Sequence, residues 1–225
     1  MNWLSSVDEF GRNAVAAAGL SACNSLMKAG IVVGILILVS TLLVFTTEIK
    51  LRGRISVPID AVFDSLDSVP AFLWALAAIS VMPDGGNLLV GAIFIVASLP
   101  IAFNAVRGSF HEVLAQPYCE AARALGTSDY RILRLHILPN SIPLLLPMFL
   151  HLLGAALAVY GAVGIFGMVS RRDLDLGVLI MRGKEQAAFD ASTLILGLFM
   201  YVVIFCVIYA TLAVVVTRNS RGRQN

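Results

Sequence analysis

The chain has 225 residues, of which 59% are hydrophobic and 13% are charged, and its formal net charge is +2. Soluble domains are about 45–50% apolar and about 25% charged, so this composition excludes an ordinary soluble domain and indicates an integral membrane protein. The basic residues do not gather into one stripe, which argues against binding of nucleic acid. The three cysteines lie far apart, so neither a disulfide framework nor a zinc or other metal site is expected.

The start of the chain predicts an interfacial or extracytoplasmic segment followed by one spanning helix. Residues 1–28 are mixed in character, and their acidic beginning carries no signal-peptide pattern. Apolar residues then run from 30 to 47, which is long enough for a hydrocarbon core of about 30 Å. Lys28 stands just before this run and can extend to the lipid headgroups. We expect a transmembrane domain over 29–217.

Residues 55–82 predict a broken helix, and residues 88–106 predict a third span that ends at Arg107. Pro70 separates a polar from an apolar stretch, so we expect an amphipathic helix, a kink at the proline and a span after it. The polar stretch carries acidic residues on one helix face, where a solvated or intersubunit role is favoured over a substrate or ion site. They are Asp60, Asp64 and Asp67. Asn104, in the third span, is expected to hydrogen-bond across helices.

Residues 107–140 form a long polar segment with helical periodicity in an otherwise apolar chain. Pro117 suits a first helical position, and Gly126 suits a left-handed cap at the end of that helix. Ser128 suits the cap of a second helix, which Pro139 is expected to end. An apolar stripe is predicted for the first helix, consisting of Tyr118, Ala121, Ala122 and Leu125.

Two more spans are predicted around an outer loop. The fourth span covers 142–169, and its His151 is expected to hydrogen-bond to a neighbouring helix rather than to bind a ligand. A hydrophilic loop is expected at 170–190, where charged residues either meet a binding protein or are simply solvated. The fifth span follows at 192–216, and 218–225 form a basic tail. Small residues that allow close helix packing in the fourth span are Gly154, Ala158, Gly161, Ala162, Gly164 and Gly167.

Five spans place the two ends of the chain on opposite sides of the membrane. If the turn at 48–54, the segment at 107–139 and the C-terminal tail share a side, that side holds 10 of the 16 Lys and Arg residues. Cytoplasmic loops carry the excess of Lys and Arg. The polar segment and the C-terminus are therefore predicted in the cytoplasm, with the N-terminus and the 170–190 loop outside.

The polar segment resembles the EAA loop of ABC-type importer permeases. The matching residues are Glu120-Ala121-Ala122, Gly126 and Ile137-Leu138-Pro139. The fuller string YCEAARALGTSDYRILRLHILPN is similar to the dipeptide/oligopeptide/nickel permease subfamily. Gly11-Arg12-Asn13, and Asp64 followed by Pro70, are similar to further positions of that family.

This resemblance implies that the loop is a coupling helix docked on a cytoplasmic ATP-binding subunit. Glu120 and Arg123 would make polar contacts with that subunit, and Gly126 would set the turn between the two helices. Ala121, Ala122 and Leu125 would pack against the chain's own span ends or against the partner. The alternative reading of the same residues is an amphipathic helix that lies on the membrane surface without a partner.

The resemblance also implies an all-α polytopic fold, the five-helix core of a type I ABC importer permease in a bacterial inner membrane. Such a chain would pair with a second, homologous permease, two ATP-binding subunits that hold ATP and Mg²⁺, and an extracytoplasmic substrate-binding protein. It would itself hold no cofactor or metal and catalyse no reaction, since it has no P-loop motif. The cargo would be short peptides, or nickel and other metal chelates. Residues expected on the pathway or between subunits are Asp64, Asn104 and His151.

Two departures from the family bear on the cargo. Family members usually have an additional span before this core, and a pattern richer in glycine and proline after the fourth span. Both departures fall on the outer side and leave the coupling motif intact. Alternatives from other classes are a standalone channel, a membrane-embedded enzyme, or an ABC permease that works in export.

Overall fold

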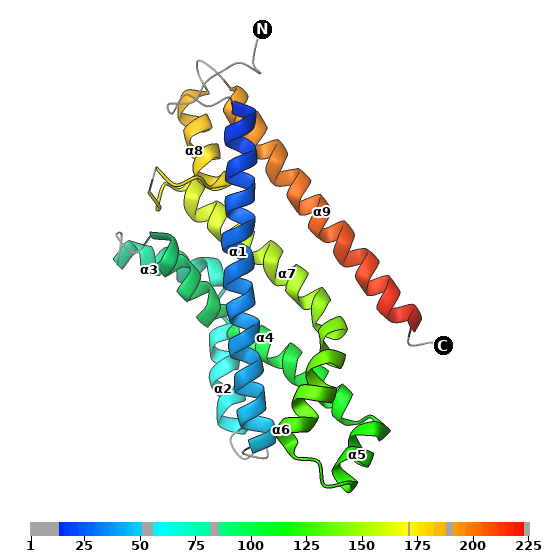
Figure 1. The fold of residues 1–225 in the computed structure, drawn as a ribbon. Helices are drawn as coiled ribbons and strands as arrows, with labels where there is room; N and C mark the ends of the chain where they lie inside the picture. The colour runs from blue at the N-terminus through cyan, green and yellow to red at the C-terminus, as the bar shows by residue number, and fades with distance from the viewer. Residues whose placement is uncertain (1–13, 51–55, 82–85, 171, 188–190, 223–225) are drawn as a thin grey trace.

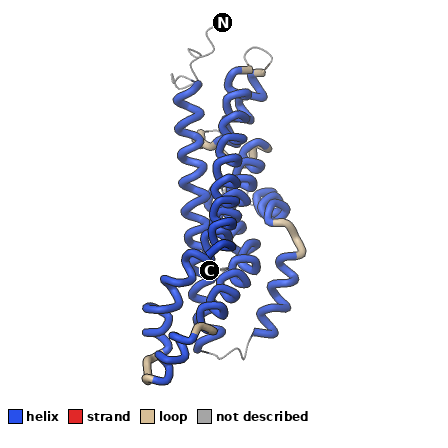
Figure 2. The backbone as a smooth tube through the Cα atoms, turned by 90° about the vertical axis from the view of Figure 1, so that its right-hand side faces the viewer, coloured by secondary structure: helices blue, strands red, loops and turns tan. Residues whose placement is uncertain are grey.

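The computed structural model describes residues 14–50, 56–81, 86–170, 172–187 and 191–222. Within these ranges all regular structure is helical (Figures 1 and 2). Several predicted features lie outside the described residues, namely Gly11-Arg12-Asn13, part of the 48–54 turn, Arg171 and the end of the tail. The elements are α1 (Ala14–Val44), the π-helical turn η2 (Phe45–Lys50), α2 (Ser56–Asp67), α3 (Ala71–Val81), α4 (Gly86–Leu114), α5 (Pro117–Ala124), α6 (Asp129–Ile132), the π-helical turn η4 (Leu133–Ile137), α7 (Leu138–Ile165), α8 (Leu176–Gln186) and α9 (Ser192–Gly222).

Four helices are long and apolar enough to cross a membrane, and a bent pair supplies a fifth crossing if it is counted as one span. The four are Val15–Thr47, Gly86–Leu114, Tyr130–Ile165 and Ser192–Arg218. The predicted all-α, five-span fold is therefore confirmed when the bent pair is included. The third span is longer than predicted, because α4 continues past Arg107 to Leu114.

The first helix begins at Ala14, well before the predicted start at residue 30. Its first half is rich in Ala and Ser, which are too weakly apolar to be recognised as part of a span but are small enough for close helix packing. Ala17, Ala18 and Ala22 are buried there against Leu176 and Leu179 of α8. Tertiary packing therefore extends α1 beyond the apolar run.

The predicted kink at Pro70 is confirmed, since Ala61–Asp67 and Ala71–Val81 meet at 79°. The predicted span after the proline is wrong. α3 has 11 residues, and a helix of that length extends only about 17 Å, short of a hydrocarbon core of about 30 Å. The two halves are long enough to cross only if they are counted together as one span, and Phe63 of the first half packs edge-on against Phe103 of α4, with ring centroids 5.0 Å apart.

The predicted hydrophilic loop at 170–190 contains α8, which packs back into the bundle. Its buried residues run from Leu176 to Met181 and include Gly183. Gly177 crosses α7 so closely that a Cβ added to Gly164 would lie 2.9 Å from the Gly177 backbone. The predicted role of small residues in the fourth span, close helix approach, is thus confirmed at Gly164.

The last helix, α9, leans away from the rest of the bundle towards its C-terminal end (Figure 1). It meets α7 through tyrosines that pack on glycines, with the Tyr209 ring lying over Gly154. Further towards its C-terminal end most of its apolar side chains are exposed. It also continues past the predicted end at residue 216 to Gly222, so the first part of the basic tail is helical.

Candidate functional site

The polar segment of the sequence forms the end of the molecule opposite α8. Figure 1 shows α5 and α6 at the lower end, together with the C-terminal end of α1 and the start of α2. α4 leads into α5, and α6 leads through η4 into α7. The helix pair therefore connects two spanning helices.

The first helix of the pair is short and well capped. Pro117 occupies its first turn, and Gln116 before it is extended, as a helix start requires. At the other end Gly126 has a φ of +76°. The Gly126 N–H donates to the Arg123 carbonyl at 2.9 Å, and the Thr127 N–H donates to the Ala122 carbonyl at 3.1 Å. These two bonds define a Schellman cap, so the predicted left-handed role of Gly126 is confirmed.

The second helix of the pair does not end at Pro139, contrary to the prediction. Residues Tyr130–Ile165 form one continuous helical run. The Leu138 N–H donates to the Leu133 carbonyl, which gives a wider π turn just before the proline. That turn accommodates a residue that has no N–H to donate. At the start of α6, the Ser128 carbonyl accepts from the Arg131 N–H at 2.9 Å.

The predicted apolar stripe of α5 does not face the bundle. The buried residue is Cys119, and Ala122 packs partly against the same core. Tyr118 and Ala121 are exposed, and 86% of Leu125 is exposed. A helix of 8 residues presents apolar side chains on more than one face, so periodicity alone does not identify the buried one.

A small apolar core anchors the helix pair to the spans. Cys119 and Ile137 are fully buried in it, whereas Leu138 and Pro139 are exposed. The partners come from three other helices, so the pair is fixed rather than loosely attached. The buried members are Val44, Phe63, Phe103, Val106, Phe110, Val113, Cys119, Ile132, Leu133 and Ile137.

The charged residues of α5 complement the helix ends. Glu120 lies in the first turn and Arg123 in the last, which is the favourable order for the helix dipole. Burial raises the pKa of the Cys119 thiol above its ordinary value, and the Arg123 guanidinium opposes this effect. The thiol therefore stays protonated at neutral pH, as suits a packing residue rather than a nucleophile.

The three residues predicted for the pathway or a subunit interface are all exposed in this chain. Asp64 lies on α2. The Asn104 side-chain oxygen accepts from the Arg107 guanidinium at 3.2 Å, so its hydrogen bond stays within α4 instead of crossing to another helix as predicted. His151 lies on the exposed side of α7 and forms no hydrogen bond with the described part of this chain. The structure does not bring these three residues into one cluster.

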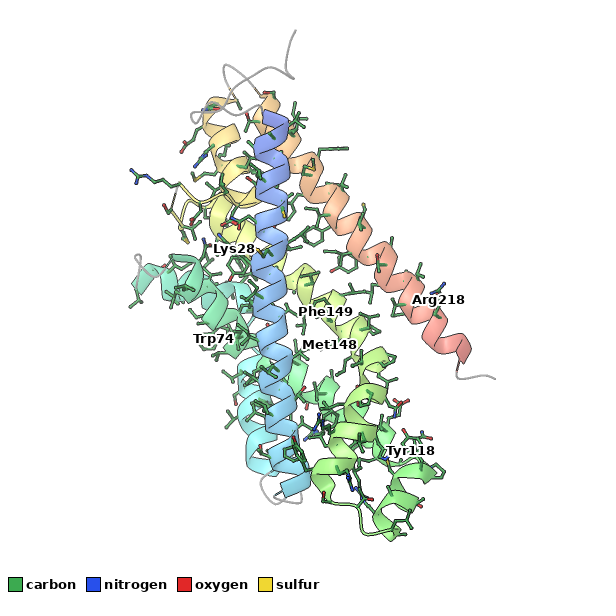
Figure 3. The ribbon with its side chains drawn as sticks, in the orientation of Figure 1. Lys28, Trp74, Tyr118, Met148, Phe149 and Arg218 are labelled. Carbon is green, nitrogen blue, oxygen red and sulfur yellow. The ribbon has the colours of Figure 1, made fainter. Side chains whose placement is uncertain are left out.

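The end of the molecule that carries α8 holds a buried ion pair that the sequence did not reveal. The Lys28 ammonium lies 2.9 Å from the Asp175 carboxylate, and Asp175 is only 4% exposed. Asn24 donates to the Leu174 carbonyl at 2.8 Å, and Ser25 accepts from the Leu176 N–H at 3.0 Å. Lys28, labelled in Figure 3, thus holds α8 rather than reaching for headgroups.

Two expectations for the predicted 170–190 loop are corrected by this arrangement. Asp175 is neither solvated nor open to a binding protein, because it is buried in the ion pair. Asp173 accepts a hydrogen bond from Asn87 at 2.7 Å, which joins the loop to the start of α4. The available signal was the spacing of Asn24, Ser25 and Lys28, which share one helix face.

Comparison with known proteins identifies the family to which this chain belongs. A family model described as the inner membrane component of binding-protein-dependent transport systems matches residues 30–222. The chain belongs to this family. The predicted resemblance to importer permeases is thereby confirmed.

The chain matches less than two thirds of the length of each of the following relatives. The chain is 25% identical over 181 residues to the probable D,D-dipeptide transport system permease protein DdpC of Escherichia coli strain K12, covering 79% of this chain and 59% of that protein. It is 34% identical over 107 residues to the probable peptide ABC transporter permease protein y4tQ of Sinorhizobium fredii, covering 48% and 36%. It is 30% identical over 105 residues to the glutathione transport system permease protein GsiD of Pectobacterium atrosepticum, covering 47% and 35%.

A solved structure shares the fold. A chain of the MetNI methionine ABC transporter, solved in inward facing conformations, matches with a TM-score of 0.67 and 18% sequence identity. The match covers 88% of this chain and 94% of that chain. At this identity the likeness concerns the fold alone.

Proposed function

We propose that this chain is a transmembrane permease subunit of an ATP-driven importer and that α5 couples it to a cytoplasmic ATP-binding subunit. The observation that carries this proposal is the surface of α5. A capped helix, anchored by Cys119, exposes Glu120 and Arg123, and the apolar Leu125 at its C-cap is 86% exposed. A fixed helix that exposes both charged and apolar side chains suits docking into a protein cleft.

The complex that follows has several other chains. We infer a second, homologous permease that completes the pathway, two ATP-binding subunits that hold ATP and Mg²⁺, and an extracytoplasmic binding protein. Asp64, Asn104 and His151 support the second permease, because ionisable and polar groups at membrane depth face a protein neighbour or water rather than lipid. The chain itself would be non-catalytic, with its N-terminus outside and its C-terminus in the cytoplasm of a bacterial cell.

The cargo we propose is short peptides. The names of the relatives, which refer to D,D-dipeptide, peptide and glutathione transport, support this class. Nickel or a metal chelate is the second cargo class, and only the resemblance of the coupling segment supports it. A binding assay on the associated binding protein would decide between the two.

Co-purification with the ATP-binding subunits tests the coupling role. Gly126→Ala places a side chain at a φ of +76°, which costs about 1–2 kcal/mol, and Glu120→Ala removes a charge from the docking surface. Together they should weaken binding of the ATP-binding subunits and transport. Gly108→Ala is the matched control, since a Cβ there meets nothing within 4 Å. Intact binding and transport in the Glu120/Gly126 double variant would show that α5 is not the coupling helix.

A further inference from the structure

Tyr118 forms an aromatic contact that joins α5 to the helix leading into α7. Its ring centroid lies 5.7 Å from that of His136, with the planes at 45°. Ring pairs at 4.5–7 Å attract each other beyond the effect of burial. The Asn140 side chain donates to the His136 carbonyl at 2.7 Å and also interacts with the Tyr118 hydroxyl. We call Tyr118, His136 and Asn140 the Tyr118 cluster; Tyr118 is labelled in Figure 3.

Tyr118 and Cys119 lie on different faces of α5. Successive residues of a helix point about 100° apart, so the two neighbouring side chains cannot hold the same face. Cys119 enters the apolar core that α4 shares with Ile132, Leu133 and Ile137, and Tyr118 adds a second contact with the same helical run through His136 in the π turn η4. Along the chain, α5 reaches that turn only through residues 125–128 and α6. The Tyr118 cluster thus links the two ends of the 125–128 connection, which contains the conformationally permissive Gly126.

The helix on the far side of this contact crosses the membrane. His136 and Asn140 belong to the continuous run Tyr130–Ile165. Displacement of α5 would therefore be transmitted to a spanning helix at His136, without first deforming the 125–128 turn. Packed elements transmit displacement, whereas a flexible connection absorbs it.

We propose that Tyr118 is a positioning residue that fixes α5 to α7, so that movement of α5 by an ATP-binding subunit moves α7 directly. This inference rests on the proposed coupling function. The Tyr118 ring contacts His136, and its hydroxyl interacts with Asn140. Tyr118→Phe should therefore keep the ring contact and most of the attachment, whereas Tyr118→Ala and His136→Ala should each loosen α5 from α7. Because both variants remove the same contact, the double variant should add little to either.

Spin labels on the chain without partners test the attachment itself. Cysteines are placed at Ala124 on α5 and Ile142 on α7, both exposed, in a chain with Cys23→Ser and Cys206→Ser. Tyr118→Ala should broaden the distance distribution and raise the population of detached α5 by about two- to tenfold. Tyr130→Ala is the matched control, because Tyr130 of α6 is 64% exposed. An unchanged distribution in Tyr118→Ala would overturn the proposal.

The complex with ATP-binding subunits tests the consequence for coupling. Adding ATP and Mg²⁺ should shift the distances from a reference label at Leu20 to Ala124 and to Ile142. In Tyr118→Ala the shift at Ala124 should persist while the shift at Ile142 shrinks by about two- to tenfold. A merely structural role would reduce both shifts equally and would overturn the proposal, as would loss of ATPase binding, which would make Tyr118 a docking contact.

The two experiments separate this inference from the function on which it rests. If the unchanged chain bound no ATP-binding subunit, the proposed function would fall, and with it the role of Tyr118 in coupling. The attachment of α5 to α7 would still be decided by the distance distribution of the isolated chain.

Discussion

Cys119 is the residue at which the polar helix pair meets the membrane-embedded core. It is fully buried with Phe110 and Val113 of α4, although it stands between a tyrosine and a glutamate in the sequence. A free cysteine behaves as a small apolar residue when it is buried. The anchoring of α5 therefore depends on a buried residue whose two neighbours in the sequence carry polar groups.

The thiol of Cys119 should react slowly with a maleimide. Burial raises its pKa in the folded chain, so the reactive thiolate stays scarce even when pH passes the ordinary thiol value of about 8.5. The unfolded chain loses that proton at lower pH, so the contribution of Cys119 to stability falls as pH rises through the ordinary value. Labelling rates of a chain that keeps only Cys119, compared with one that keeps only the exposed Cys23, check this. Equal rates in the folded state would show that α5 detaches readily.

At the scale of the elements, α1 and α8 form a unit at the end of the molecule opposite α5. Asn24, Ser25 and Lys28 of α1 hold the chain from Leu174 to Leu176, where α8 begins. The helix α8 then crosses α7 at Gly177 and Gly164. A short helix with a polar second half is thereby fixed between spans by one ion pair, backbone bonds and a glycine crossing.

Removing one partner of this ion pair should destabilise the protein more than removing both. Asp175→Asn or Lys28→Met leaves the other group buried and unpaired, which costs about 3–5 kcal/mol. The apolar double variant Lys28→Met/Asp175→Leu should recover a part of that loss. Thermal unfolding in detergent, followed by size-exclusion chromatography, gives the comparison, with Lys184→Met on the exposed side of α8 as control. A double variant less stable than both single variants would contradict the expectation.

At the scale of the whole molecule, the predicted orientation places α5 inside the cell and α8 outside. Single cysteines at Ala124 and Lys184, both exposed, report on the two ends in a chain with Cys23→Ser and Cys206→Ser. In right-side-out membrane vesicles, a membrane-impermeant maleimide should label Lys184→Cys at once. It should label Ala124→Cys only after the membrane is opened. The reverse pattern would invert the topology.

Hydropathy predicted the spanning helices because burial in lipid acts on each segment separately. The Schellman cap at Gly126 and the kink at Pro70 were also readable, since both follow from the covalent properties of one residue. The burial of α8 and of the first half of α1 was not. Both involve contacts between residues far apart in the chain, such as Lys28 and Asp175, which are separated by 147 positions. The buried face of α5 was missed because a two-turn helix carries too little periodicity.

The continuous run from Tyr130 to Ile165 has a mechanical consequence. Its 36 residues would extend about 54 Å if straight, whereas the hydrocarbon core is about 30 Å thick. One end lies at α5 and the other reaches the glycine crossing with α8, so the run is a lever between these two points. If the lever is stiff, a tilt of about 10° about one end carries the other through about 9 Å, close to the width of a helix. A slight rotation at the α5 end would then be enough to open or close a gap at the α8 end.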